Sequence, residues 1–286
     1  DLIEAQLKAG ALGVGFGLEY QPGSRRWEVA EMFRVAGKYT ASCHCHTRYG
    51  TLLESEHNLT AVQEVIANGL VHGAPVHVCH VPSMGLANTW QALALIEAAQ
   101  SRGLDVTSDF YPYTAFATGI ATEVFAEGWQ QKFGIDYKDL EWAKTHERLT
   151  EETFKKYQQE GGTVVAHAIP ESAVQDAVKS KATMVGSDGS LNNGVGHPRA
   201  TGSFARVLGH YSRDLGLISL EEAVAKMTIM PARRFEKRCL DFKRKGRMEV
   251  GADADIVVFD AEKVIDKATF DNPGALSVGF DWVLVG

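Results

Sequence analysis

The sequence predicts an α/β fold in which βα units surround a parallel sheet. Short apolar runs alternate with amphipathic helical segments along much of the chain, which is the pattern of repeated βα units. The 286 residues suffice for one α/β barrel or for two domains. Several of the apolar runs end in histidine or aspartate, at the place where α/β enzymes carry their catalytic groups.

The individual elements follow from hydrophobic periodicity. Strands are expected at 12–18, 39–46, 75–80, 104–110, 163–167 and 183–187. Helices are expected at 1–9, 26–37, 59–72, 87–102, 171–179, 202–214 and 219–229, followed by a short basic helix from Pro231 to about Leu240. The strands at 104–110 and 163–167 compete for one place in the parallel sheet.

The regular alternation is interrupted between about 114 and 160. This segment is too long for a βα loop, and we expect a helical insertion over the mouth of the sheet that could act as a lid. Residues 1–240 are therefore assigned to a partial catalytic barrel and residues 241–286 to a β-rich part of a small second domain. In this second domain we expect two short strands joined by a turn within 246–260, and a further strand at 279–285. Because the chain opens within a helical pattern, we expect it to be a piece of a longer protein without its N-terminal part.

Composition excludes several classes of partner. The formal net charge of -7 gives no support for binding to nucleic acid or an anionic membrane. No apolar run approaches the roughly 20 residues that span a bilayer. The four cysteines have no spacing typical of a disulfide framework, which favours a reducing, cytoplasmic location. Oligomeric state cannot be read from these features.

Histidines at the ends of neighbouring strands predict a metal site. His46 and His80 each end a strand-like run, and imidazoles at the carboxyl ends of parallel strands converge on one edge of the sheet. His44 shares a face with His46, so both could point inward. Asp109 and His167 also close strands. The alternative is that these histidines are hydrogen-bonded core or surface residues.

The stretch 183–202 carries a second candidate pair. Asp188 follows the apolar run at 183–185 in a glycine-rich loop, and Arg199 comes eleven residues later. A buried acid beside a positioned guanidinium could combine proton transfer with an anchor for a substrate carboxylate. A capping aspartate in a Ser-Asp-Gly turn and a surface arginine would be the structural alternative.

Several motifs together resemble the N-acyl-D-amino-acid deacylases of the amidohydrolase superfamily. They are the segments 10–23, 46–48, 75–80, 109–113, 185–189 and 197–199, and near the C-terminus 246–247, 251–260 and 267–270. The resemblance implies a (β/α)8 TIM-like metal-dependent hydrolase barrel that holds zinc, with a small β-sandwich domain built from both chain ends. It further implies that His46 and His80 are metal ligands, that Asp188 is the catalytic acid/base, and that Arg199 binds the substrate carboxylate with a tyrosine of Tyr111-Pro112-Tyr113, preferably Tyr113.

We therefore expect a hydrolase that cleaves a small-molecule N-acyl-D-amino acid to a carboxylic acid and a free D-amino acid. Deacylases of this type usually have a lysine two residues after the His80 equivalent, whereas this chain has Pro82. A cyclic-amide or dipeptide hydrolase with the same metal and aspartate therefore stays open. From another class, a catalytically inert barrel used for binding or assembly also stays open, because further metal ligands would have to come from an earlier part of the barrel.

Overall fold

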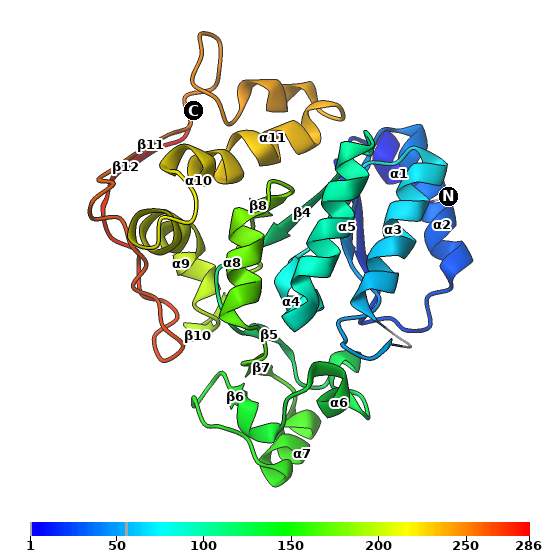
Figure 1. Ribbon diagram of the computed structural model, residues 1–286, viewed down its shortest axis with the longest axis vertical. Helices are drawn as coiled ribbons and strands as arrows, with labels where there is room; N and C mark the ends of the chain where they lie inside the picture. Colours follow the sequence, from blue (N-terminus) through cyan, green and yellow to red (C-terminus); the bar gives the residue numbers. More distant parts are fainter. Residues whose placement is uncertain (1, 55–56) are drawn as a thin grey trace.

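Five parallel strands form the central sheet of the part of the chain that the computed structural model describes, residues 2–54 and 57–286 (Figure 1). In spatial order they are β1 (Gly13–Gly17), β2 (Ser42–His46), β3 (Val76–Val78), β4 (Val106–Phe110) and β8 (Thr183–Val185). Each neighbouring pair runs parallel, so the carboxyl ends of these strands lie at one edge. The expected α/β fold with a parallel sheet is confirmed.

Helices that connect consecutive strands cover the sheet in the same order as the strands. α2 (Arg26–Lys38), α3 (Asn58–His72), α5 (Thr89–Ser101) and α8 (Glu171–Lys179) pack against one another in sequence and lie in front of the sheet in Figure 1. Their inner faces bury Phe33, Val62 and Ile96 completely. Burial of these side chains on the sheet holds the carboxyl edge of the strands in a fixed position.

The other α-helices outside the insertion are short. They are α1 (Leu2–Lys8), α4 (Val81–Gly85), α9 (Arg199–Arg206) with a π-helical continuation (Val207–Asp214), α10 (Leu220–Met227) and α11 (Ile229–Glu236), besides 3-10 segments at Leu86–Asn88, Glu123–Phe125, Tyr137–Asp139 and Leu240–Arg244. Pro231 lies inside the first turn of α11, where its missing N–H costs no hydrogen bond.

The insertion contains a sheet as well as helices, which corrects the purely helical expectation for 114–160. β5 (Phe116–Gly119), β7 (Thr163–Ala166) and β6 (Leu140–Trp142) form an antiparallel sheet in that order, accompanied by α6 (Trp129–Phe133) and α7 (Glu151–Glu160). An aromatic cluster that includes Phe125, Trp129 and Phe154 fills its interior. These aromatic side chains belong to the same continuous hydrophobic core as the buried residues of the parallel sheet, so the insertion packs as part of the domain.

This arrangement also decides which strand belongs to the parallel sheet. Residues Ser108–Phe110 of β4 pair with Thr183–Val185 of β8, so the segment 104–110 takes the contested place. The segment 163–167 instead supplies β7, the middle strand of the insertion. The insertion thus continues to about residue 169 and ends at α8.

The C-terminal segment forms one antiparallel pair, β11 (Ile256–Phe259) with β12 (Phe280–Leu284). The strand expected near 246–250 is not formed, because Gly246 has a positive φ of 68° and the chain turns at 250–252. A two-residue hairpin of β9 (Leu191–Asn192) and β10 (Val195–Gly196) follows β8.

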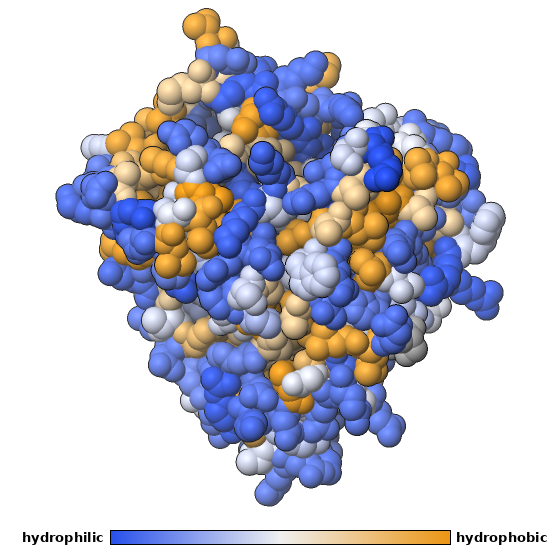
Figure 2. Space-filling view, viewed as in Figure 1, coloured by the Kyte–Doolittle hydropathy of each residue, from blue (hydrophilic) through white to orange (hydrophobic). Residues whose placement is uncertain are grey.

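The surface is largely polar in the view of Figure 2, with apolar side chains gathered around α9 and α10 and near α5. Exposed apolar residues in these regions include Phe204, Val224 and Trp90. Among residues 2–54 and 57–286, none of the helices combines the length and the apolar character that a membrane span requires.

Candidate active site

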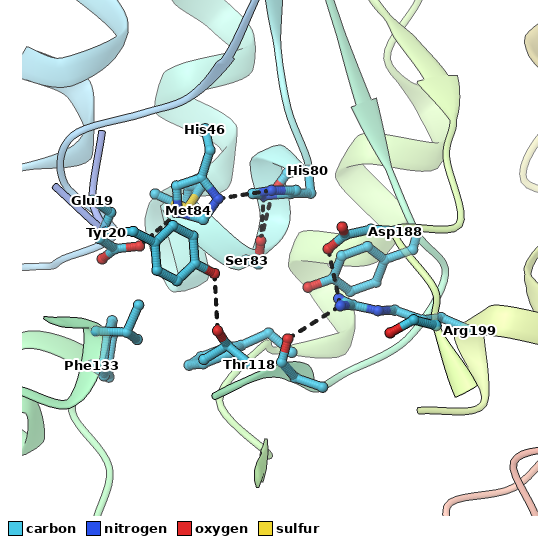
Figure 3. A pocket seen from close by; sticks show the side chains of 15 residues that line it. Glu19, Tyr20, His46, His80, Ser83, Met84, Thr118, Phe133, Asp188 and Arg199 are labelled. Carbon is cyan, nitrogen blue, oxygen red and sulfur yellow. Dashed lines mark hydrogen bonds and ion pairs between the residues drawn. The ribbon is translucent and has the colours of Figure 1, made fainter. Parts of the chain in front are cut away.

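A cavity of about 390 Å³ opens between the carboxyl edge of the parallel sheet and the insertion (Figure 3). The carboxyl ends of β1, β2, β3, β4 and β8 and the start of α9 supply most of its polar side chains, and the insertion supplies most of its apolar wall. The lining residues are Glu19, Tyr20, His46, His80, Ser83, Met84, Tyr111, Phe116, Ala117, Thr118, Val124, Phe133, Asp188, Ser190 and Arg199. Four of the five side chains predicted from the sequence are among them.

His46 and His80 face each other in this cavity. His46 Nδ1 lies 3.1 Å from His80 Nε2. The other nitrogen of His46 lies 2.8 Å from the Glu19 carboxylate, and a carboxylate only accepts hydrogen bonds, so this nitrogen carries the proton. His46 Nδ1 is therefore a lone pair that points at His80.

Ser83 fixes the tautomer of His80 in the same way. The Ser83 hydroxyl donates its proton to the backbone carbonyl of His80 at 2.8 Å, so its oxygen accepts from His80 Nδ1 at 2.9 Å. His80 Nε2 is then also a lone pair. Burial lowers the pKa of His80 to about 4, and the neighbouring His46 adds to this effect, which keeps the ring neutral.

Two lone pairs that face each other at 3.1 Å repel unless a cation lies between them. Two nitrogen ligands of a tetrahedral zinc, each about 2.0–2.1 Å from the ion, are roughly 3.3 Å apart. Each imidazole is oriented through its second nitrogen, which is how metal-binding histidines are usually held. The donor set therefore fits zinc, with His46 and His80 as the residues that would hold it.

Asp188 and Arg199 form an ion pair on the opposite side of the cavity from Glu19 (Figure 3). Arg199 Nη2 donates to Asp188 Oδ2 at 3.0 Å and to the carbonyl of Ala117 at 3.2 Å. The arginine side chain is 7% exposed, while the aspartate side chain is 49% exposed. The aspartate therefore reaches the cavity from the loop after β8, and the guanidinium approaches it from the start of α9.

Tyr111, and not Tyr113, lines the cavity. Its ring lies under the Arg199 guanidinium, 4.4 Å from the carbon Cζ, and its hydroxyl is buried without a hydrogen-bond partner among the described residues. Burial raises the pKa of Tyr111 to about 12, so the hydroxyl stays a donor. Tyr113 instead donates to Asp266 at 3.1 Å and packs beside Arg206. The structure thus separates Tyr113 from the site, because Pro112 and the end of β4 turn it toward the C-terminal segment.

The other strand-end residues do not line the cavity, and most of them are partly buried. His44 stacks on Phe235, and burial lowers its pKa to about 4. His167 belongs to the insertion and bonds Glu141 at 3.0 Å. His77, Cys79 and Asp109 form a group whose possible metal-binding atoms lie within 4.8 Å of one another.

Sequence reasoning missed Glu19 and Ser83, whose side chains lie within hydrogen-bond distance of His46 and His80. Glu19 is the second residue after β1, and its carboxylate also accepts from the Gly50 N–H at 3.2 Å. Ser83 lies in the first turn of α4, three residues after His80. Their position just after a strand end was a signal in the sequence that could have found them. Neither residue type, however, indicated a role in orienting a histidine.

This chain is similar in sequence to known proteins over nearly its whole length. A family model described as the amidohydrolase family matches residues 24–279. An N-acyl-D-glutamate deacylase of Alcaligenes xylosoxydans xylosoxydans is 36% identical over 99% of this chain, and a D-aminoacylase of the same organism is 34% identical over 100% of it. The chain spans 59% of the length of each of these two relatives.

A solved structure gives the same relationship in three dimensions. N-acyl-D-glutamate deacylase from Bordetella bronchiseptica, complexed with zinc and a phosphonate mimic of the tetrahedral intermediate, superposes with a TM-score of 0.82 at 33% identity. The match covers 100% of this chain and 60% of that one. The relatives named here are deacylases of N-acyl-D-amino acids, and because the family model matches residues 24–279, the chain belongs to the amidohydrolase family.

Proposed function

We propose that the full-length protein is a zinc-dependent hydrolase that cleaves N-acyl-D-amino acids to a carboxylic acid and a free D-amino acid. The observation that carries the proposal is one cavity in which two facing imidazole lone pairs lie beside an ion-paired Asp188 and Arg199. The names of the relatives support the D-amino-acid substrate.

We infer the architecture around the site from the same relatives. The five-stranded sheet is part of a (β/α)8 barrel, and residues 241–286 belong to a small β-sandwich domain. The TM-scores of 0.82 and 0.80 to two solved deacylases support the barrel, and the antiparallel pair of β11 and β12 supports the sandwich.

The chain's own residues divide the reaction between them. Zinc held by His46 and His80 supplies Lewis acidity and promotes ionisation of water when it is bound. Asp188 accepts the proton of the attacking water and returns it to the leaving amide nitrogen. The Arg199 guanidinium binds the substrate carboxylate, and the free hydroxyl of Tyr111 is placed to donate to the same group.

Fixing the carboxylate sets the direction of the rest of the substrate. With its carboxylate at Arg199, the scissile amide lies toward the two histidines, because these groups line one cavity of about 390 Å³. Anchoring of this kind converts an encounter into an oriented reaction and lowers the barrier.

A substrate panel on the zinc-loaded, full-length protein tests the proposal. It contains N-acetyl-D-amino acids, their L enantiomers and cyclic amides, assayed for released amine with and without a chelator. We expect turnover of the D substrates that the chelator abolishes and that added zinc restores. Turnover confined to cyclic amides, or no bound zinc at all, would contradict the proposal.

A further inference from the structure

Asp109 lies directly behind His80 and is bonded to its backbone. The Asp109 side chain leaves β4 toward the loop after β3, where Oδ1 accepts the backbone N–H of His80. Its other oxygen, Oδ2, accepts from His77 Nε2 at 2.8 Å. Gly186 leaves room for this carboxylate, because a Cβ there would lie 3.3 Å from Asp109 Cγ.

A chain of donors fixes the direction of these bonds. Arg234 Nη1 donates to Thr107 Oγ1 at 2.9 Å, and Thr107 Oγ1 lies 2.8 Å from His77 Nδ1. The threonine proton therefore points to His77 Nδ1, which leaves the proton of His77 on Nε2, the atom that faces Asp109. Asp109 is thus held from one side by an oriented imidazole while it holds His80 from the other.

The backbone that Asp109 holds is unusual. His80 has a φ of 34° and a ψ of 57°, in the left-handed region that non-glycine residues avoid. The residue is also the point where β3 ends and the five-residue α4 begins. A bond to its N–H stabilises this conformation, and that conformation decides where His80 Nε2 lies, 3.1 Å from His46 Nδ1.

We propose that Asp109 is a positioning residue, which keeps His80 in its left-handed conformation so that its Nε2 can bind the metal. The inference rests on the proposed function, because it takes His80 to be a zinc ligand. It differs from a direct role in which His77, Cys79 and Asp109 would together hold a metal. Both oxygens of Asp109 already accept hydrogen bonds, Oδ1 from the backbone N–H of His80 and Oδ2 from His77 Nε2.

Zinc affinity of the full-length protein, measured by competition with a chelator, tests this role. Asp109→Ala removes the acceptor of the His80 N–H, and we expect zinc affinity to fall about 10- to 100-fold with unchanged stoichiometry. Asp109→Asn keeps an oxygen for the His80 N–H but turns an N–H₂ donor toward the proton on His77 Nε2, so affinity should fall, but by less than in Asp109→Ala. Ser108→Ala is the matched control, since Ser108 is the neighbouring residue of β4, is fully buried and bonds the carbonyl of Ala182 instead of His80.

Thr107→Val provides a second, milder variant if Asp109→Ala does not fold. It removes only the hydroxyl that orients His77, and it should weaken zinc binding by a few-fold. Wild-type affinity in Thr107→Val, or in folded Asp109→Ala, would overturn the positioning role. Loss of one zinc equivalent in both Asp109→Asn and Cys79→Ser would overturn it in favour of a direct ligand role. Absence of zinc from the wild-type protein would instead overturn the proposed function.

Discussion

Asp188 combines an exposed carboxylate with a strained backbone. Its φ of 47° lies in the left-handed region, which asparagine tolerates better than most residues. Asp188→Asn therefore removes the base without a new backbone strain. We expect kcat to fall by a factor of about 10² or more while zinc content stays close to wild type. If kcat is unchanged in steady-state assays, Asp188 is only a turn residue and not the base.

Arg199 tests the class of substrate. The guanidinium is buried, stacks on Tyr111 and pairs with Asp188, so its orientation is fixed before substrate binds. Arg199→Lys keeps the positive charge but loses the planar fork that binds a carboxylate through two hydrogen bonds. We expect a marked rise in KM for N-acyl-amino acids and a smaller rise for amides without a carboxylate. Equal losses on both substrate types would rule out the carboxylate clamp.

Sequence reasoning at the residue scale succeeded where strand geometry decides. His46 and His80 were expected at neighbouring strand ends, and the structure places their nitrogens 3.1 Å apart. Tyr111 and Tyr113 could not be separated in that way, because β4 ends at Phe110 and alternation has no meaning beyond it. Glu19 was missed for the same reason, since it orients His46 from a turn. Their roles in catalysis stay predictions.

At the scale of elements, long periodic segments were predictable and short ones were not. The helix expected at 171–179 is α8, with the same bounds, because its apolar residues recur at helical spacing. β5 and β6 have four and three residues, too few to show alternation. Their pairing with β7 depends on contacts across the insertion, which is why a helical lid was expected instead of a mixed one.

The contact between α10 and β8 depends on a buried lysine. Lys226 is 4% exposed, and its Nζ donates to the carbonyl of Thr183 and to Thr183 Oγ1, both at 3.0 Å, and to the carbonyl of Ser180. Burial lowers the pKa of Lys226 from 10.5 to about 8. Below about pH 8 the amine is charged in both folded and unfolded chains, so the full cost of burying the charge is present.

Between about pH 8 and 10.5 the folded state binds fewer protons than the unfolded state, so the free energy of unfolding rises with pH. Relative to Lys226→Met, the wild-type protein should gain about 2 kcal/mol between about pH 7.5 and about pH 9.5. Urea denaturation of both proteins at the two pH values measures this difference. A constant difference would show that the amine titrates at its ordinary pKa when folded.

At the scale of the whole molecule, the alternation of apolar strands and helices predicted the parallel sheet, because parallel strands require crossover helices. What the alternation could not predict was the order β1-β2-β3-β4-β8, since two segments competed for the place beside β8. The insertion separates these two strands along the chain but leaves them hydrogen-bonded neighbours. That arrangement brings Asp188 into the cavity that contains His46 and His80.

The position of zinc in the full-length protein tests the central claim most directly. Crystals grown with zinc and measured at its absorption edge would give an anomalous difference map. We predict a zinc peak between the two facing nitrogens, about 2.0–2.1 Å from His46 Nδ1 and from His80 Nε2. A map with zinc only at His77, Cys79 and Asp109, or with none in the cavity, would contradict the account.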